Sequence, residues 1–396
     1  MASRANPDVT ISGAGIGGLA SALSLQKGDV GCLVLEKSPT LGEVGAGIQI
    51  SPNARHVLAA LGVGDAVSAA GFEPEHAVIQ DGISGKVISK TKLKQMCIQR
   101  YGAPYIHIHR ADLHDILHKA ALASGVEIRL GEEVTEVTQT NDAVTAHTQK
   151  GSYESDLLIA ADGGRSTHQT KLNPDSGFAF RGQVAWRGNI PTKDLPKGLL
   201  PPDATVWIGP KHHFVSYYIR GGSLVNFVAV QERANWTNSD WRQEGDVQEL
   251  RDAFKNWHPS IRQILEACTH TNLWALYDSD PLANWTDCRL ALLGDAAHPM
   301  LPFMAQGAGM AIEDAFVLAK CLSRQDIPEA LKTYQSQRET RTAMVQKMSR
   351  DNAKLFHRGD DLKDILQKAK LALGSRFPSL VQHQLDKVYG VDVTRS

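Results

Sequence analysis

The sequence predicts an α/β protein in which one domain is interrupted by a second, β-rich domain and followed by C-terminal helices. Three observations predict this arrangement. A strand, a glycine-rich turn and a helix follow one another in residues 8–25, and residues 171–276 alternate in the manner of antiparallel strands. After Pro281 the strand–turn–helix pattern returns. We therefore expect the first domain to be assembled from segments on both sides of the β-rich one.

The composition is that of a globular protein with small partners. The chain has 396 residues, of which 42% are hydrophobic and 21% charged, and this length is enough for two domains. The net charge is −1 without runs of like charge, which does not indicate a nucleic-acid groove or binding to an anionic membrane. The opening MASRANPDVTISGAG has no apolar signal region, and no stretch reaches the length of a membrane span. We expect a cytoplasmic protein.

The cysteines and histidines do not form a metal-binding pattern. The five cysteines are scattered and never occur as C-x-x-C, which argues against a disulfide framework and a zinc cage. The fifteen histidines include no H-E-x-x-H or similar ligand spacing. We expect no metal.

The elements of the α/β part can be placed in order. Residues 8–37 form one βαβ unit, with the helix from Ile16 to Leu25 and the second strand ending at Glu36, so the two strands are expected to be parallel. Residues 112–124 are helical by their apolar spacing, and residues 156–164 form another strand that stops in a turn. The strand RLALLGD and a Gly/Ala-rich helix follow Pro281.

The β-rich part is identified by alternating segments such as TVWIGPKHHFVSYYIRGGSLVNFVAVQ, in which residues 220–223 form the turn of an antiparallel hairpin. We divide the chain accordingly. The dinucleotide-binding domain comprises residues 1–74, 103–170 and 277–327, the substrate domain residues 75–102 and 171–276, and the C-terminal helical region residues 328–396.

The first glycine-rich turn has the spacing Gly13-x-Gly15-x-x-Gly18, and Glu36 ends the next strand. Glycines there allow a tight turn and close approach of a pyrophosphate to the helix N-terminus, and the acidic residue accepts hydrogen bonds from ribose hydroxyls. Glutamate rather than a basic residue favours FAD or NAD over NADP. The alternative is a tight turn that needs small residues for packing alone.

Three further turns follow predicted strands or begin helices. They are HRADL at 109–113, ADGG at 161–164 and GD at 294–295. Each by itself is typical of a helix cap or a turn. Together they are more than NAD alone requires.

With these motifs the sequence resembles the single-component FAD-dependent aromatic hydroxylases over nearly the whole chain. The fingerprint with Glu36, the ADG at 161–163 and the GDAAHPM…P…QGA at 294–308 are that family's three signatures, in its order and spacing. GEVGAGIQISPNA, RYGAPYIHIHRADLH and HPMLPFMAQGAGMAIEDA are similar to the subgroup of salicylate hydroxylase, 3-hydroxybenzoate 6-hydroxylase and 6-hydroxynicotinate 3-monooxygenase.

The resemblance implies roles for residues around FAD. Asp295 and Arg110 would contact the ribityl region, Asp162 would lie near the pyrophosphate and the NAD(P)H side, and Pro299 would line the space beside the flavin. The helix beginning near Gly307 and Ala308 would direct its N–H groups at the N1–C2=O edge of the flavin, which becomes anionic on reduction. The alternative for that helix is close packing on a sheet.

The substrate side is expected on the strand around HHFVSYY. Side chains alternate along a strand, so His213 and Tyr217 share one face while His212 and Phe214 share the other. Hydroxylation of a phenol needs removal of its proton, which a histidine can perform. In the related 3-hydroxybenzoate and 6-hydroxynicotinate enzymes, the residues matching His213 and Tyr217 hold the ring hydroxyl. The alternative is a structural histidine, and a one-residue bulge would exchange the two faces.

Two residues depart from the relatives' pattern at the substrate side. Phe303 stands where they have a polar residue, and Gln49 stands where the nicotinate enzyme has a histidine. The ring substituents of the substrate therefore stay open, from a carboxylated aromatic to a larger or less polar phenol.

The sequence thus predicts an FAD-dependent monooxygenase. NAD(P)H, with NADH and NADPH both open, would reduce the flavin, O2 would form the C4a-hydroperoxide, and a hydroxylated aromatic would take one oxygen atom. Two alternatives are a flavoprotein oxidase or dehydrogenase of the same fold and a binding protein that keeps the fold without the chemistry. The oligomeric state, including a homodimer, stays open.

Overall fold

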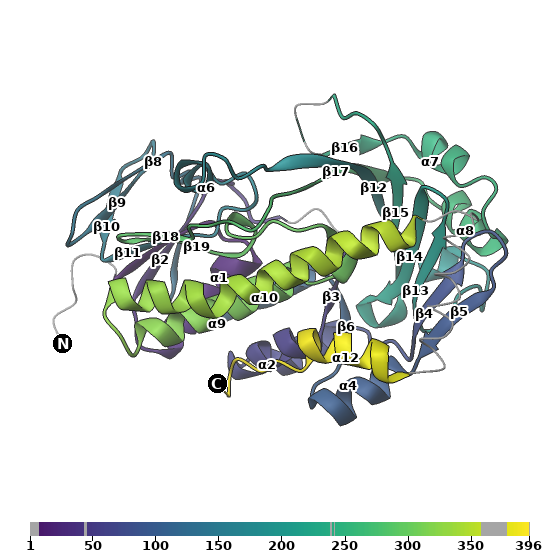
Figure 1. Ribbon diagram of the computed structural model, residues 1–396, viewed down its shortest axis with the longest axis horizontal. Coiled ribbons are helices and arrows are strands. Elements are labelled where there is room, and N and C mark those ends of the chain that lie inside the picture. Colours follow the sequence, from purple (N-terminus) through teal and green to yellow (C-terminus); the bar gives the residue numbers. More distant parts are fainter. Residues whose placement is uncertain (1–7, 43–45, 238–239, 241, 358–377, 396) are drawn as a thin grey trace.

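The computed structural model describes residues 8–42, 46–237, 240, 242–357 and 378–395. Part of the GEVGAGIQI motif (residues 43–45) and part of the predicted C-terminal helical region (residues 358–377) lie outside the described residues. Figure 1 shows two main sheets at opposite ends of the molecule and a long helix, α10 (Ile327–Phe356), running between them.

The first main sheet has six strands in the order β18-β19-β11-β1-β2-β7. Its parallel strands are β1 (Val9–Ser12), β2 (Cys32–Glu36), β7 (Glu127–Leu130), β11 (Leu157–Ala160) and β19 (Leu290–Leu292), and β18 (Thr286–Asp287) is antiparallel at the edge. β1, β11 and β19 are buried throughout, as expected for parallel strands covered on both faces. The predicted parallel βαβ unit is confirmed, with α1 at Ile16–Lys27.

Helices cover this sheet. α1 packs against α5 (Arg110–Ala123) and α9 (Gly307–Leu322). Parallel strands put their carboxyl ends at one edge, so the turns after β1, β2, β11 and β19 meet there. Small residues let α1, α9 and the β19 turn approach closely, because a Cβ added to Gly17 would lie 3.3 Å from that of Ala311 and 2.9 Å from a Leu293 methyl.

The second main sheet has eight strands in the order β16-β17-β12-β15-β14-β13-β4-β5. The strands are β4 (Ala77–Asp81), β5 (Val87–Thr91), β12 (Ala179–Pro191), β13 (Ala204–Gly209), β14 (His212–Ile219), β15 (Leu224–Glu232), β16 (Arg242–Gly245) and β17 (Thr271–Asp278). Neighbouring strands are antiparallel except β13 and β4. The predicted hairpin is confirmed, because β14 and β15 pair from His212 to Ile219 across the short helix η2 (Arg220–Gly222).

The two faces of this sheet differ. Its outer face carries Trp186, Phe214 and Phe227, which pack with Phe254 beside α7 (Val247–Ala253) and with Ile261 of α8 (Pro259–Glu266). Its inner face packs against Leu301 and Phe303, which come after the last strand of the first sheet, β19, in the sequence. We call inner face the side of β12, β14 and β15 that carries Ala185, Arg187, His213, Tyr217 and Val230.

The remaining elements of the part of the chain that the structure describes are two small sheets and further helices. Two small sheets are formed by β8 (Glu136–Gln139), β9 (Val144–His147) and β10 (Ser152–Ser155) and by β3 (Gly47–Ile50) with β6 (Ile106–His109). The other helices are α2 (Pro52–Ala60), α3 (Gly64–Ala70), α4 (Leu93–Tyr101), α6 (Thr167–Leu172), α12 (Pro378–Tyr389) and the short η1 (Thr192–Asp194), η3 (Gly294–Ala296) and η4 (Pro302–Met304).

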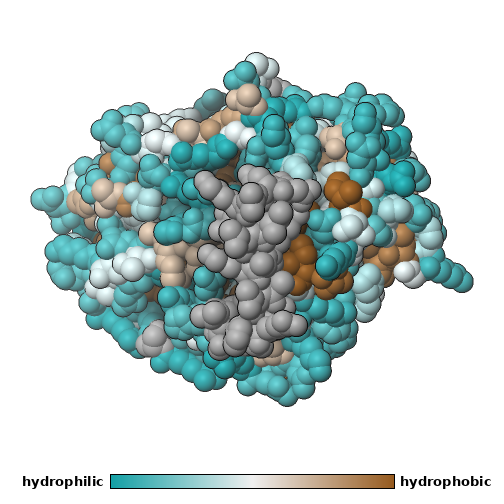
Figure 2. Space-filling model, turned by 45° about the vertical axis from the view of Figure 1, so that its right-hand side comes forward, coloured by the Kyte–Doolittle hydropathy of each residue, from teal (hydrophilic) through white to brown (hydrophobic). Residues whose placement is uncertain are grey.

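The α10 helix connects the two halves. It contacts α9 and β18 on one side and η4 and β13 on the other. The surface seen in Figure 2 is mostly hydrophilic, with small hydrophobic patches. Among the helices that the structure describes, none is long and apolar enough to cross a membrane.

Candidate active site

The turns singled out in the sequence come together at the carboxyl edge of the six-stranded sheet. Gly13 has φ +105°, and a Cβ there would lie 2.5 Å from the Ala161 carbonyl oxygen, so only glycine fits. A Cβ on Gly164 would lie 3.5 Å from Pro299, and one on Gly307 would lie 3.7 Å from Asp295 Oδ1. The turns after β1, β11 and β19 and the start of α9 therefore form one site.

The first turn leaves room for a ligand. A Cβ on Gly15 would meet nothing within 4 Å, whereas one on Gly18 would overlap the Gly13 carbonyl oxygen. The N-terminus of α1 has no side-chain cap and no acidic residue in its first turn. Its N–H groups are thus available to an anionic group, and Gly15 marks the open side from which that group approaches.

Glu36 lies beside this turn. Its Oε2 accepts a hydrogen bond from the Ala14 N–H at 2.7 Å, and its Oε1 accepts one from the Ser38 N–H at 2.8 Å. These two bonds fix the carboxylate at the end of β2, where a ribose hydroxyl of a dinucleotide would reach it.

Asp162 and Arg110 supply polar groups on either side of the turn. Asp162 Oδ1 is buried without a hydrogen-bond partner in the part of the chain that the structure describes, and burial raises the pKa of this carboxyl, with the charge of His168 acting in the opposite direction. Such an atom fits a ligand that donates a hydrogen bond to it. Arg110 is half-buried at the start of α5, and its backbone N–H bonds to the Ala46 carbonyl oxygen at 3.0 Å.

The start of α9 is a second uncapped helix N-terminus. Gln306 is its N-cap without a side-chain cap bond, and no acidic residue occurs in the first turn that begins with Gly307 and Ala308. Asp295 is exposed beside it. By contrast, α7 and α10 are capped by aspartates, Asp246 and Asp326. The free N–H groups of α9 suit a group that becomes anionic.

A buried ionic network supports this loop from below. His298 Nε2 lies 2.5 Å from Asp314 Oδ2, and Arg338 bonds to both Asp314 and Glu313 at 2.6 Å. Arg341 adds two bonds of 2.7 Å to Glu313. Burial alone would raise the pKa of both carboxyls, but the nearby cations more than offset it and hold both values below their usual range. The network fixes the loop that carries Asp295 and Pro299.

On the substrate side, the predicted alternation is present in β14. The register between β14 and β15 is continuous from His212 to Ile219, so no bulge exchanges the faces. His212 faces Phe254 and Trp257 on the outer side, with ring centroids 5.3 and 6.3 Å away. His213 lies on the inner side, where its ring centroid is 5.0 Å from that of Phe303. Two residues expected on the substrate side are thus in contact.

His213 is fully enclosed and has a second imidazole behind it. Its Nδ1 lies 2.6 Å from Nε2 of His357, the C-cap residue that directly follows α10. Burial lowers the pKa of His213 well below its usual value, and electrostatic repulsion from the nearby His357 and His212 lowers it further. His213 is therefore neutral near pH 7, which leaves one ring nitrogen able to accept a proton.

Tyr217 lies four residues after His213 on β14 and on the same face of the strand. Its ring is 4.4 Å from that of His107 on β6, and a Cβ on Gly47 would lie 2.9 Å from its hydroxyl. Burial raises the pKa of Tyr217, and the Arg187 charge and a hydrogen bond with Asn226 partly offset this. Asn226 Oδ1 also accepts a bond from the Gly47 N–H at 2.7 Å. The inner face thus reaches the GAGI segment.

Gln49 faces the same region from β3. It pairs with His107 in the β3–β6 ladder, and its Oε1 accepts a hydrogen bond of 2.6 Å from the Tyr105 hydroxyl. Pro299 is buried, and its carbonyl oxygen accepts a bond of 3.0 Å from the Gln346 side chain of α10. The residues predicted for the cofactor and for the substrate thus occupy neighbouring turns and strands.

Comparison with known proteins decides the family. The family model described as "FAD binding domain" matches residues 6–349. The chain belongs to the FAD-dependent aromatic hydroxylases. It is 36% identical over 370 residues to a 3-hydroxybenzoate 6-hydroxylase of Klebsiella oxytoca, covering 91% of this chain and 92% of the relative. It is 34% identical over 353 residues to a 6-hydroxynicotinate 3-monooxygenase of Pseudomonas fluorescens, covering 88% and 91%.

A solved structure gives the same result for the fold. A variant of Klebsiella pneumoniae HpxO, complexed with FAD, superposes with a TM-score of 0.84 at 27% identity and covers 97% of this chain and 99% of its own. The predicted fold class and the predicted cofactor FAD are confirmed. This flavoprotein is a monooxygenase by its family.

Arg187 is a residue of this hydroxylase that the sequence analysis did not single out. It follows Trp186 on β12 and lies on the inner face, where it pairs with Val228. Its Nε is buried without a hydrogen-bond partner, and no carboxylate of the described residues offsets its charge. Burial lowers the pKa of its guanidinium, and the positive charge of Arg110 adds to this, while Tyr217 acts in the opposite direction. Strand alternation around Trp186 was the signal that could have found it.

His107 was missed as well. It is fully buried, both ring nitrogens lack a hydrogen-bond partner among the described residues, and burial lowers its pKa to about 3. Unpaired buried imidazole nitrogens next to Tyr217 are the kind of group that a polar ligand satisfies.

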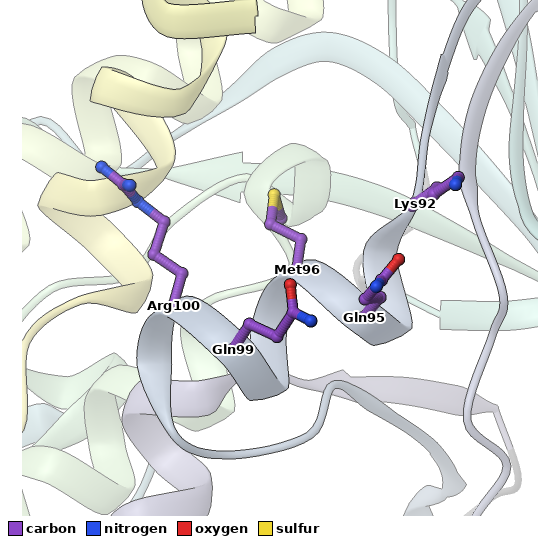
Figure 3. A pocket seen from close by; sticks show the side chains of 5 residues that line it. All are labelled: Lys92, Gln95, Met96, Gln99 and Arg100. Atoms are coloured by element: carbon purple, nitrogen blue, oxygen red, sulfur yellow. The ribbon is translucent and has the colours of Figure 1, made fainter.

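An open groove elsewhere on the surface is separate from these residues. Figure 3 shows its lining along α4, where Lys92, Gln95, Met96, Gln99 and Arg100 surround it. Arg100 forms two bonds of 2.6 Å with Asp386 of α12. None of the groove's residues belongs to the cofactor or substrate side. The described residues also contain no group of three or more His, Cys, Asp or Glu side chains arranged to hold a metal.

Proposed function

We propose that this flavoprotein is an NAD(P)H-dependent monooxygenase that hydroxylates an aromatic carboxylate bearing a ring hydroxyl. One observation carries the proposal: the inner face of the eight-stranded sheet presents a neutral imidazole, a phenol and an uncompensated guanidinium, from His213, Tyr217 and Arg187, toward the turns of the FAD-binding half. An aromatic anion with a hydroxyl matches these three groups.

The residues around the carboxyl edge would hold FAD. The observations that fit it are the open space at Gly15, the orphaned Asp162 Oδ1 and the two uncapped helix N-termini. Bound there, FAD would accept electrons from NAD(P)H and, once reduced, would activate O2. The residues that would contact it are Gly13, Gly15, Gly18, Glu36, Arg110, Asp162, Asp295, Gly307 and Ala308.

His213 would act on the ring hydroxyl. Its Nδ1 is engaged by His357, so Nε2 is the atom left to accept the phenolic proton. Removing that proton makes the ring more electron-rich at its ortho and para carbons, which are the positions that take the oxygen atom. Tyr217, on the same face, would hydrogen-bond the hydroxyl oxygen and keep it aligned with His213.

Arg187 would bind the carboxylate. A buried guanidinium without an anion is unfavourable, and a bidentate carboxylate is its best partner. The relatives named above act, by their names, on 3-hydroxybenzoate and 6-hydroxynicotinate, both of which combine a carboxylate with a ring hydroxyl. The same combination explains why one face carries both an acceptor and a cation.

Phe303, Pro299 and Gln49 would shape the rest of the pocket. Phe303 packs edge-on against His213, so it offers an apolar wall to the ring near the hydroxyl. Gln49, fixed by Tyr105, would offer an amide to a ring substituent. We further propose that NAD(P)H binds only transiently, because the sequence has a single dinucleotide fingerprint.

A substrate screen tests this function. Purified holoenzyme is mixed with NADH or NADPH and with 3-hydroxybenzoate, salicylate, 6-hydroxynicotinate or the corresponding carboxamides, and reductant consumption and product mass are recorded. We expect faster reductant consumption and a product that has gained one oxygen atom with at least one acid, and little of either with its carboxamide. Where the oxygen atom enters at the ring carbon that bears the carboxylate, CO2 leaves and the product mass is lower by that loss. Oxidation of a substrate without oxygen insertion would favour an oxidase or dehydrogenase instead.

A further inference from the structure

The imidazole of His213 continues into a chain of hydrogen-bonding groups that leads to the surface. His213 Nδ1 lies 2.6 Å from His357 Nε2, and His357 Nδ1 lies 3.1 Å from Glu232 Oε1. The His213 side chain is buried and that of His357 is 2% exposed, whereas that of Glu232 is 43% exposed. The chain therefore joins the enclosed inner face to solvent in two steps.

We infer that His357 and Glu232 carry the proton that His213 takes from the substrate out to solvent. This inference rests on the proposed function, because it assigns the route of the proton that the proposed base removes. His357 acts through His213 and is thus a positioning and proton-carrying residue, without contact to the substrate.

The proton transfer along His213, His357 and Glu232 conserves both protons and charge. At the start, His213 Nδ1–H donates to His357 Nε2, and His357 Nδ1–H donates to Glu232. When Nε2 of His213 takes the phenolic proton, the Nδ1 proton of His213 passes to His357 Nε2, and the Nδ1 proton of His357 passes to Glu232. One proton enters, one leaves from Glu232 to water, and both imidazoles stay neutral. The reverse transfer protonates the oxygen of the product and restores the first arrangement.

Gln183 supports the state after transfer. Its Nε2 lies 3.1 Å from the same His357 Nδ1 that faces Glu232. Once Nδ1 has given up its proton, it can accept a hydrogen bond from the amide of Gln183. His357 thus has a partner for each of its two neutral tautomers, which is what a two-way carrier requires.

The surroundings explain why the proton has to move on. Burial lowers the pKa of His357 to about 4, with Glu232 acting in the opposite direction, and burial also lowers the pKa of His213 well below its usual value. Neither ring holds an added proton near pH 7. Among the described residues, His212 and Glu232 are the titratable groups that influence the pair. The other elements in contact contribute Gln183 from β12, Phe303 from η4 and Phe356 from α10.

Proton release on ligand binding tests the path in the holoenzyme. Binding of 3-hydroxybenzoate, in a weak buffer containing a pH indicator, is followed in a stopped-flow instrument for the wild-type protein and for His357→Gln, which can hydrogen-bond but cannot carry a proton. We expect proton release with the wild type and at least a roughly tenfold slower release with His357→Gln, partly restored by added imidazole. His212→Gln, which alters an imidazole off the path, is the matched control.

Glu232→Gln keeps the test decisive if His357→Gln folds poorly. Its side chain is partly exposed, so the fold should tolerate the change, and we expect slower release with unchanged FAD content and melting temperature. Release from either folded variant at the wild-type rate, or no release from the wild type, overturns the path. Release that depends on His357 without hydroxylation of any probe would overturn the proposed function and leave the path supported.

Discussion

Replacing Arg187 by methionine removes the guanidinium from the inner face while keeping a side chain of similar width. If Arg187 binds the substrate carboxylate, the variant should bind 3-hydroxybenzoate more weakly and 3-hydroxybenzamide almost as before. A hydrogen-bonded contact to a charged group contributes about 1.5–3 kcal/mol, which is roughly a 10- to 150-fold change in Kd. We expect the upper part of this range, because Nε is buried and water screens the pair little.

The assay is a titration of the flavin absorbance with each ligand. Arg242→Met is the matched control, since Arg242 and Arg187 both lie 5.5 Å from the ring centroid of Trp274, but Arg242 is exposed on the edge strand β16. The melting temperature of the ligand-free variant adds a second readout. An unpaired buried cation destabilises the free protein, so Arg187→Met should melt no lower than the wild type.

Three results would contradict binding of the substrate carboxylate by Arg187. Equal loss of affinity for the acid and the carboxamide would mean that Arg187 shapes the pocket without recognising charge. A drop in melting temperature together with loss of FAD would mean that Arg187 supports the cofactor instead. The same loss in Arg242→Met would assign the effect to stacking on Trp274.

Four further predictions concern the cofactor, the base, the buried network and acid. Gly15→Val fills the open space at the start of α1, so the purified protein should lose most of its flavin absorbance per chain; full flavin content would contradict the site. His213→Ala should keep FAD but lower hydroxylation by about a hundredfold or more, with NAD(P)H still consumed and hydrogen peroxide formed, and His212→Ala on the outer face should not. Arg338→Met removes the cation that Asp314 and Glu313 share and leaves His298 as the ion-pair partner of Asp314, so it should lower the free energy of unfolding, measured in urea, by about 3–5 kcal/mol; an unchanged value would show that the network is dispensable. The unfolded chain protonates His107 near pH 6.5 but the folded protein only near about 3, so the melting temperature should fall as the pH is lowered below 6.5, and a flat profile would contradict the burial of His107 as a neutral ring.

Local sequence patterns predicted the parts of the fold that depend on neighbours in the chain. The strand–turn–helix at Gly13, the second strand ending at Glu36 and the hairpin around residues 220–223 follow from periodicity and turn chemistry within short windows. The face assignment of His213 and Tyr217 also followed, because alternation is a local property of a strand. The division into domains and the site roles stay predictions.

Groups that meet only through tertiary contacts could not be predicted in this way. His213 and His357 are 144 residues apart, and no local pattern relates the end of α10 to β14. Arg187 lies among other polar residues of β12, such as Gln183 and Asn189, and the lack of a carboxylate beside it among the described residues becomes evident only when the neighbouring strands are in place. The acidic pair Glu313 and Asp314 was visible in the sequence, but its cation, Arg338, comes from a separate helix.

The α10 helix acts as a strut that sets the spacing between the two working halves of the molecule. Its 30 residues correspond to about 45 Å of continuous helix. Arg338, in the first half of α10, is bonded to the ionic network under the Asp295 loop. His357, directly after the last residue of α10, contacts the imidazole of His213. A helix is stiff along its axis, so a substitution that slides α10 moves both attachments together. Flavin retention and the efficiency of oxygen insertion should therefore change in parallel in variants of this helix, even where the altered side chain touches neither site.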